Sequence, residues 1–278
     1  MKSTSLLFAA FLSCASTGLA ATAYWTSGGD GISWSDGANW ASGVTPAQGD
    51  DIVVSTQPTA FPTVLGFDPT PALFTVNSFT FGAGLSQGLE VWPMATEVLR
   101  IGAGGVHNQS GYRHGFLVIV EAVSNSIWNA GTLGLGVSVL RTNTYQITLE
   151  SGSLSLGTNT VVDINSANSA GGIFGNVVMD GALTISLNYL PTQTTQWQLF
   201  DQASGHFTHF AIEGVFSSGS SVFQDDVWAI SLAESYRFEF NENSGTLSFI
   251  VIPEPGSAAL LTTALAGFLY RRRSKRGQ

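Results

Sequence analysis

Short apolar and β-branched runs alternate with Gly, Asn and Ser between residues 72 and 190. Each run is four to six residues long, which is typical of a β-strand. No segment of this stretch repeats an apolar face at helical spacing over three turns. The pattern therefore predicts an all-β domain with strands at 73–76, 98–101, 116–120, 132–135, 145–149, 153–156, 161–164 and 183–187.

The spacing of these strands leaves two architectures open. It varies between about 8 and 25 residues, so no strict repeat is present. In a β-solenoid, each turn buries its side chains by stacking on the next turn, and no helices are needed. A Greek-key β-sandwich also gives short strands at intervals of about 8 to 12 residues. We expect a solenoid, with the β-sandwich as the alternative.

Residues 191–250 are richer in aromatic side chains. Tyr236, Phe238 and Phe240 alternate with polar residues and so form one apolar face of a strand. The turn-forming residues 243–245 then lead into a second apolar run at 246–249. The pattern predicts a hairpin that closes the core.

The first residues have the order of a secretory signal peptide. Lys2 precedes an apolar stretch at 6–12, and small residues follow up to Ala23. We expect a signal peptide over 1–23, exported through the Sec translocon and cleaved after Ala23 or Ala20. The exported β-rich domain would then cover residues 24–252.

The last residues form a stop-transfer pattern. An apolar run at 256–270, predicted to be a single transmembrane helix, is followed by a basic end that would stay cytoplasmic. The basic residues are Arg271, Arg272, Arg273, Lys275 and Arg276.

Pro253, Glu254 and Pro255 stand directly before this helix. The motif, helix and basic end together resemble the PEP-CTERM sorting domain of Gram-negative bacteria, over residues 253–278. The resemblance implies that an exosortase recognises the Pro-Glu-Pro motif, and that the basic end fixes the topology. It also implies a transient stay in the inner membrane, then transfer to the cell surface or an exopolysaccharide matrix. A plain single-pass anchor is the alternative.

The start of the exported domain contains Trp25, Trp34 and Trp40, followed by a Gly-Asp-Asp turn and a strand at 52–54. This order resembles the beginning of autotransporter-like and PEP-CTERM surface proteins, where the segment caps a right-handed parallel β-helix. Aromatic side chains here could cover the unpaired end of a β stack, which would otherwise recruit other chains.

The charge of residues 24–252 excludes one class of binding partner. The chain has 44% hydrophobic and 10% charged residues, and residues 24–252 hold four arginines and no lysine against 18 acidic residues, a net charge near −14. Such a surface repels nucleic acid, so we expect no nucleic-acid partner. The single cysteine, Cys14, lies in the signal peptide, which excludes disulfides and thiol chemistry from the exported domain.

Few residues suggest chemistry. The run 84–88 matches the G-x-S-x-G nucleophile pattern, but the residues after it include Pro93 and lack helical periodicity. His206 and His209 would point to opposite faces of a strand, and so make a poor metal pair. Turn-forming acidic residues are candidate calcium ligands: Asp30, Asp36, Asp50 and Asp51.

We therefore expect a non-enzymatic, secreted protein of the cell surface or matrix, associated with exopolysaccharide and without a required cofactor. One alternative is a polysaccharide-active enzyme with a β-helix groove. Another is a carbohydrate-binding module in which exposed tryptophans stack on sugar rings. The candidates for that stacking are Trp25, Trp34, Trp40, Trp92 and Trp128.

Overall fold

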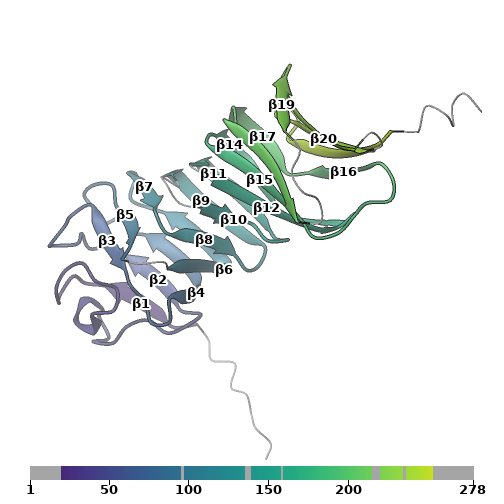
Figure 1. Cartoon of the computed structure of the whole chain (residues 1–278). Helices are drawn as coiled ribbons and strands as arrows, with labels where there is room; N and C mark the ends of the chain where they lie inside the picture. Colours follow the sequence, from purple (N-terminus) through teal and green to yellow (C-terminus); the bar gives the residue numbers. More distant parts are fainter. Residues whose placement is uncertain are drawn as a thin grey trace, which may run out of the picture.

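The computed structural model describes residues 20–94, 97–134, 139–157, 159–214, 220–233 and 236–252. These residues form a β-solenoid of about seven turns, followed by a five-stranded antiparallel sheet at its C-terminal end (Figure 1). The only helical element within the described ranges is a short 3₁₀ segment, η1 (Gly37–Asn39). The prediction of an all-β solenoid is confirmed, and the β-sandwich alternative is wrong.

The strands of the solenoid are β1 (Thr22–Trp25), β2 (Asp51–Val54), β3 (Val64–Phe67), β4 (Leu73–Phe81), β5 (Glu90–Pro93), β6 (Val98–Asn108), β7 (Arg113–Phe116), β8 (Ile119–Ala122), β9 (Ser126–Gly134), β10 (Val139–Arg141), β11 (Gln146–Ser155), β12 (Asn159–Ser166), β13 (Ser169–Ala170), β14 (Gly172–Met179), β15 (Ala182–Leu187), β17 (Phe200–Gly205) and β18 (His209–Gly214).

Parallel pairing arranges the strands in three ladders, which form the faces of the coil. The first face contains β1, β2, the second halves of β4 and β6, and the first halves of β9, β11 and β14. The second face contains β3, β5, β7, the second halves of β9, β11 and β14, and β17. The third face contains the first halves of β4 and β6, then β8, β10, β12, β15 and β18.

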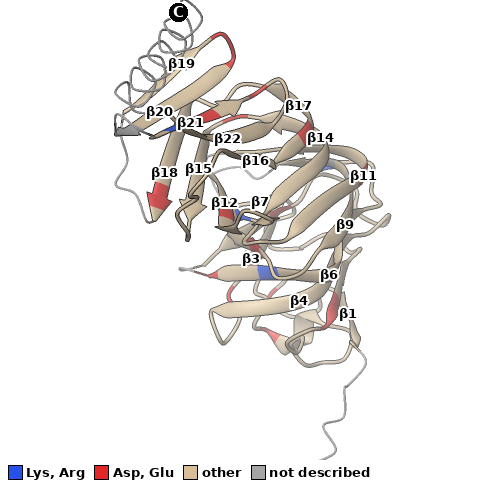
Figure 2. Cartoon of the chain, turned by 90° about the vertical axis from the view of Figure 1, so that its right-hand side faces the viewer, with Lys and Arg blue, Asp and Glu red and all other residues tan. Residues whose placement is uncertain are grey.

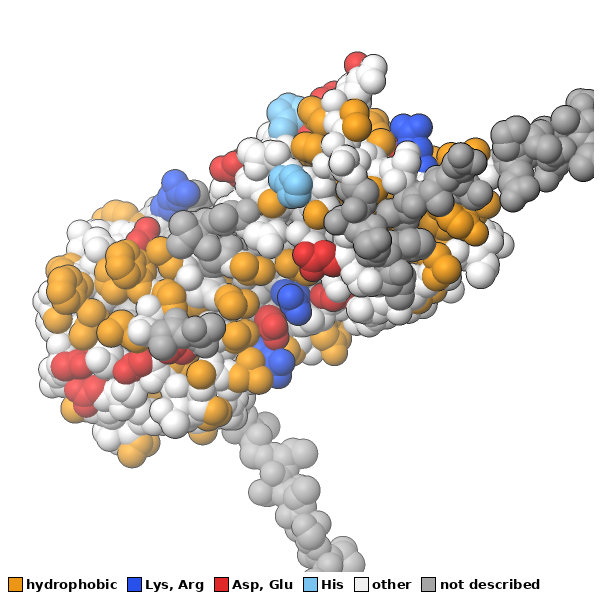
Figure 3. Space-filling view, viewed as in Figure 1, with side chains coloured by type: hydrophobic (Ala, Val, Ile, Leu, Met, Phe, Trp, Pro, Cys, Tyr) orange, Lys and Arg blue, Asp and Glu red, His pale blue; other side chains and the backbone are white. Residues whose placement is uncertain are grey.

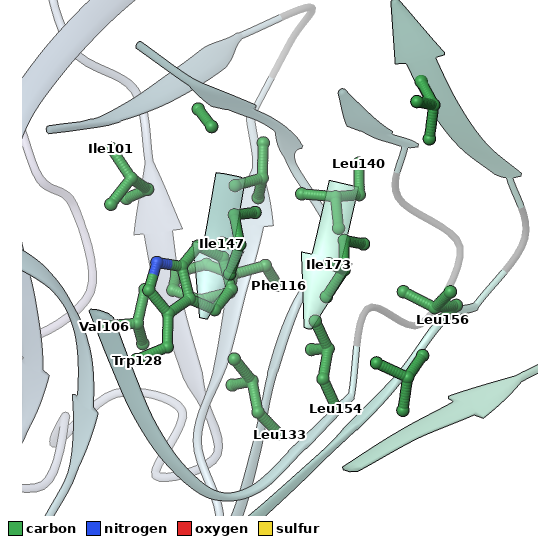
Figure 4. Packing of buried hydrophobic residues seen from close by; sticks show 14 of the residues in the cluster. Ile101, Val106, Phe116, Trp128, Leu133, Leu140, Ile147, Leu154, Leu156 and Ile173 are labelled. Atoms are coloured by element: carbon green, nitrogen blue, oxygen red, sulfur yellow. The ribbon is translucent and has the colours of Figure 1, made fainter. Parts of the chain in front are cut away.

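The core consists of side chains stacked along these ladders. On the third face the register aligns Phe74, Leu99, Val120 and Leu140, all buried. Figure 4 shows side chains from all three faces meeting inside the coil, among them Trp128, Leu133 and Leu140. Burial of a large apolar side chain contributes about 1.5–3 kcal/mol, so the stack is the main source of stability.

The turn length explains why no repeat is visible in the sequence. Thr22 pairs with Asp51, which pairs with Ser78, so the first two turns take 29 and 27 residues. Between β9 and β11, Ser126 pairs with Ile147, and the turn takes only 21 residues. One apolar run also crosses a corner of the coil: β7 ends at Phe116 and β8 begins at Ile119, so the single strand predicted over 116–120 is wrong.

Glycine lets long strands bend from the first face to the second. Gly131 in β9 and Gly152 in β11 have φ of 55° and 80°, in the left-handed region that other residues avoid. A Cβ on Gly152 would lie 2.1 Å from the carbonyl oxygen of Gly131. Successive turns can therefore approach closely at this corner only because both residues lack a side chain.

The N-terminal end of the coil is covered by the predicted tryptophans. Trp25, Trp34 and Trp40 are each at most 2% exposed, and the rings of Trp34 and Trp40 lie 4.8 Å apart, edge to face. The Trp34 ring also contacts Phe67 and Phe74 of the first turns. The cluster continues the coil's apolar core into the loops at its end.

The C-terminal end is covered by the end sheet, with strand order β16, β22, β21, β20, β19. The bounds are β16 (Thr195–Gln198), β19 (Ser221–Gln224), β20 (Val227–Ala233), β21 (Tyr236–Asn241) and β22 (Thr246–Val251). The predicted hairpin of β21 and β22 is confirmed, with Gly245 in its turn at a φ of 63°. Phe240 of the sheet stacks on Phe210 of the last coil turn, 5.9 Å between ring centres.

The predicted signal peptide and the predicted sorting tail fall almost wholly outside the described residues, since 1–19 and 253–278 are not described. No helix within the described ranges is long and apolar enough to cross a membrane.

Candidate functional site

A shallow groove crosses β5, β7 and β9 on the outside of the second face. Its lining combines glycine, small polar residues, one carboxylate and one guanidinium. The lining residues are Thr63, Gln87, Gly88, Glu90, Arg113, His114, Gly115, Leu117 and Gly134.

Outward-facing glycines form the floor of the groove. Gly115 pairs with Glu90 on one side and with Gly134 on the other. A Cβ on Gly115 would lie 3.1 Å from the carbonyl oxygen of Gly134, and a Cβ on Gly134 would lie 2.9 Å from Nη2 of Arg113. The Arg113 guanidinium therefore extends over the floor, where a larger residue would displace it.

Trp92 stands beside the groove on β5, two residues after Glu90. Its side chain is 44% exposed, and its Nε1–H donates a hydrogen bond of 2.9 Å to Oε2 of Glu90. Trp92 is paired with Gly66 of the preceding turn, so no side chain of β3 stands beside it at that position. The hydrogen bond fixes the indole and leaves part of the ring open to solvent.

Other apolar side chains extend this surface. Phe61, Met94 and Tyr112 are 60%, 57% and 43% exposed. In Figure 3, hydrophobic side chains gather at the N-terminal end of the coil, over β3 and β5. Exposed apolar side chains that gather in a patch with a polar rim mark a binding surface, whereas single exposed apolar residues do not.

His114 supports the groove from within. It is 2% exposed, and its ring stacks on Phe81 at 4.2 Å. Burial lowers the pKa of His114 to about 4. Because Nδ1 accepts a hydrogen bond from the Leu89 N–H (3.0 Å), Nε2 carries the proton and donates to Ser110 Oγ. His114 is thus neutral near pH 7, with both nitrogens engaged.

The structure separates the five candidate tryptophans. Residues 26–50, between β1 and β2, cover the N-terminal end of the coil and are called the N-terminal cover here. The tryptophans buried in the core or against this cover are Trp25, Trp34, Trp40 and Trp128. Trp92 alone of the five is exposed, and the alternation along β5 could have indicated this, because Val91 is buried between Glu90 and Trp92. No local pattern pointed to Arg113 or to the glycine floor.

The four candidate calcium ligands lie in two separate places. Asp30 and Asp36 are in the N-terminal cover; Asp36 accepts from the Asp30 N–H (2.8 Å) and the Ala38 N–H (3.0 Å). Burial alone would raise the pKa of Asp30, but hydrogen bonds from Ser33, Ile32 and Asn39 hold it well below its usual range.

Asp50 and Asp51 lie at the start of β2. Asp50 accepts hydrogen bonds from the N–H groups of Ala21 and Ala47, and Asp51 accepts from Asn77 and Ser78. These carboxylates serve as acceptors for the loops and strands around them. The structure does not bring Asp50 and Asp51 together with Asp30 and Asp36, and calcium binding by any of the four stays a prediction.

Residues 84–88 form a loop between β4 and β5, and a strand follows instead of a helix, so the nucleophile pattern lacks its structural context. His206 and His209, which were predicted to be a poor metal pair, do not belong to one cluster of potential metal ligands in the described residues. His206 contacts Asp226 and Glu242, whereas His209 begins β18 and is absent from this cluster. A hydrogen bond with Glu242, and the charge of Glu242, raise the pKa of His206.

No protein-family model, curated protein or solved structure matches this chain.

Proposed function

We propose that the protein is an exported, non-enzymatic β-solenoid of the cell surface or extracellular matrix that binds a polysaccharide along its second face. The observation that carries this proposal is Trp92, which is exposed and oriented by Glu90 beside a groove with a glycine floor. An indole that is fixed in this way can stack on the apolar face of a sugar ring.

The groove suits a flat, hydroxyl-rich chain. Gly115 and Gly134 let a ligand approach the backbone, while Arg113 offers donors and Glu90 offers an acceptor to hydroxyl groups. The ladder of the second face continues from β3 through β5 and β7 to β9, so a polymer could follow several turns of the coil. Because the exported domain carries a net charge near −14, a neutral glycan fits better than a polyanion. Figure 2 shows how few basic side chains the surface offers.

Binding is favoured over cleavage. Glycosidases need two carboxyl groups flanking the bond that breaks. Glu90 is the one carboxylate among the residues that line this groove, and its Oε2 already accepts from Trp92. His114 has both ring nitrogens engaged, so it offers no free acid or base to a ligand.

A glycan titration followed by isothermal calorimetry tests the proposal, with neutral and anionic bacterial exopolysaccharides as probes. Trp92→Ala should weaken binding of the neutral glycan about tenfold, equivalent to about 1.4 kcal/mol. Tyr24→Ala is the matched control, because Tyr24 is also an exposed aromatic residue (51%) but lies on the first face. Equal affinity for both variants, or no binding by the wild-type protein, would contradict the proposal.

Export and sorting complete the proposed function. Its support is the order of signal peptide, Pro-Glu-Pro motif, apolar run and basic end in the sequence. We take the solenoid to be right-handed, as nearly all parallel crossover connections are. The exosortase would act at Pro253, Glu254 and Pro255, leaving the β-rich domain outside the inner membrane.

The cleavage site of the signal peptide can be refined. β1 begins at Thr22, and the Ala21 carbonyl accepts from the Asp51 N–H at 2.8 Å. Cleavage after Ala20 would keep the strand whole, whereas cleavage after Ala23 would remove half of it. The intact mass of the protein isolated from its native cells should therefore correspond to a chain that starts at Ala21 and lacks the residues after the Pro-Glu-Pro motif. A mass that retains Arg271 to Gln278 in the inner membrane would mean a plain anchor.

A further inference from the structure

Three potential metal ligands meet where the end sheet joins the coil. His206 follows β17 of the coil, Asp226 lies in the turn between β19 and β20, and Glu242 follows β21. One ligand atom from each residue lies within 4.8 Å of the other two. The cluster therefore joins the last coil turn to two separate turns of the sheet.

Glu242 is held so that one oxygen faces His206. The residue is 2% exposed, and its Oε1 accepts from the Phe207 N–H at 2.9 Å and from Trp228 Nε1–H at 2.8 Å. Its Oε2 lies 2.7 Å from Nδ1 of His206. Two donors thus orient the buried carboxylate from behind, which is how outer hydrogen bonds orient metal ligands.

Asp226 is oriented in the same manner. Its Oδ2 accepts from Nδ2 of Asn243 at 3.0 Å, which leaves Oδ1 on the side of His206, 4.0 Å from Nδ1. The backbone also links the two acidic residues, since the Glu242 N–H donates to the Asp226 carbonyl at 2.9 Å. Both carboxylates are therefore fixed in place before any ligand arrives.

The charges of the cluster do not balance. Two carboxylates face one imidazole, so even a protonated His206 leaves an excess negative charge beside a buried acid. The arginines with salt bridges in the described part of the chain pair elsewhere, Arg100 with Glu121 and Arg237 with Glu239. A divalent cation would neutralise both carboxylates at once, and burial makes such neutralisation favourable.

We propose that His206 Nδ1, Asp226 Oδ1 and Glu242 Oε2 bind a divalent transition-metal ion of the Zn²⁺ type. One imidazole and two carboxylates suit Zn²⁺ better than Ca²⁺, which prefers oxygen ligands alone. Ligands at about 2.0–2.1 Å from a tetrahedral ion lie roughly 3.3 Å apart. The His206 ring must therefore move slightly away from Glu242, now at 2.7 Å, and toward Asp226, now at 4.0 Å. It can do so because its side chain is 64% exposed.

The ion would fasten the end sheet to the coil and keep a fourth coordination position open to solvent. This site is independent of the groove on the second face, and either can be correct without the other. Metal binding would also add stability to the folded chain, because the unfolded chain does not bring the three residues together.

Calorimetric titration of the metal-free, full-length protein with Zn²⁺ tests the proposal, together with Co²⁺ absorption spectroscopy and thermal unfolding. We expect one bound ion per chain, a tetrahedral Co²⁺ spectrum and a higher unfolding midpoint with Zn²⁺, but weaker binding of Ca²⁺. His206→Ala and Asp226→Asn should each weaken Zn²⁺ binding tenfold or more.

His209→Ala is the matched control, since His209 is exposed nearby on β18 but lies outside the cluster. Both His206 and Asp226 are accessible enough for the variants to fold, and thermal unfolding without metal checks this. The proposal fails if the wild-type protein does not bind Zn²⁺. It also fails if His206→Ala and His209→Ala change the affinity equally, because binding would then be nonspecific.

Discussion

The coil and the end sheet reach stability by different routes. In the coil, parallel partner residues lie 19 to 29 positions apart in the sequence, and every turn depends on its neighbours. In the end sheet, β20, β21 and β22 pair with their sequence neighbours through tight turns. The last turn of a parallel stack leaves its strands unpaired and its core open, and an antiparallel sheet packed across that end covers it. The comparison shows that the end sheet completes the coil instead of forming a separate unit, since Phe240 packs on Phe210 of the last turn.

The largest expected effect comes from opening a cavity in the coil. Phe81 is fully buried and contacts Phe79, Phe116 and His114. Phe81→Ala should lower the free energy of unfolding by about 3–5 kcal/mol in urea titrations. Phe61→Ala is the control, because Phe61 is 60% exposed, and it should cost less than about 0.5 kcal/mol. Similar losses in the two variants would contradict the stacked core.

The stability of the N-terminal cover should depend on the side-chain amide of Asn39. Asn39 is fully buried; its Oδ1 accepts from the N–H groups of Gly29 and Gly31, and its Nδ2 donates to Asp30 and Ser33. Asn39→Ala leaves these partners unsatisfied and should cost about 2–3 kcal/mol. The same unfolding assay checks this, and a neutral result would mean that the cover is not attached through Asn39.

Two glycines distinguish strain caused by a positive φ from strain caused by a Cβ that meets a neighbouring turn. Gly152→Ala should cost about 2 kcal/mol, because it combines a φ of 80° with a Cβ placed 2.1 Å from the Gly131 carbonyl oxygen. Gly111 has a similar φ of 78° but nothing within 4 Å of a Cβ. Gly111→Ala should therefore cost only about 1 kcal/mol. If the two variants are equally stable, the close approach of successive turns is wrong.

The effect that is smallest near neutral pH, because it appears only on acidification, is a pH dependence of the coil. His114 has a pKa of about 4 in the folded chain, against 6.5 when unperturbed, so the unfolded chain binds more protons in this interval. The contribution of neutral His114 to the free energy of unfolding is fully present above pH 6.5 and is lost as the pH falls toward 4. Imidazole NMR titration should show His114 titrating near pH 4, and His114→Gln should flatten the dependence. Titration of His114 near 6.5 would contradict its burial.

Much of the fold could be predicted from local pattern. Apolar runs such as 73–76, 98–101 and 183–187 form strands, and the alternation of Tyr236, Phe238 and Phe240 predicted the closing hairpin. These signals are local, because the order of apolar and polar residues along one strand decides which of its side chains are buried. The error at 116–120 arose where an apolar run continues around a corner of the coil.

The candidate site was less accessible to sequence reasoning. Trp92 stood among five possible tryptophans, and the alternation of Glu90, Val91 and Trp92 was the one local sign that it faces outward. Arg113, Gly115 and Gly134 meet Glu90 only because β5, β7 and β9 stack in register. The cluster of His206, Asp226 and Glu242 likewise joins residues up to 36 positions apart.

The sequence by itself determined that the described chain is all-β, that its start is rich in tryptophan, that residues 24–252 are acidic, and that a hairpin closes the core. Only the tertiary structure decided the length of each coil turn, the side chains that face outward, and the two sites. The reason is physical: local pattern specifies which side chains prefer burial, but the register between distant parallel strands depends on packing across whole turns.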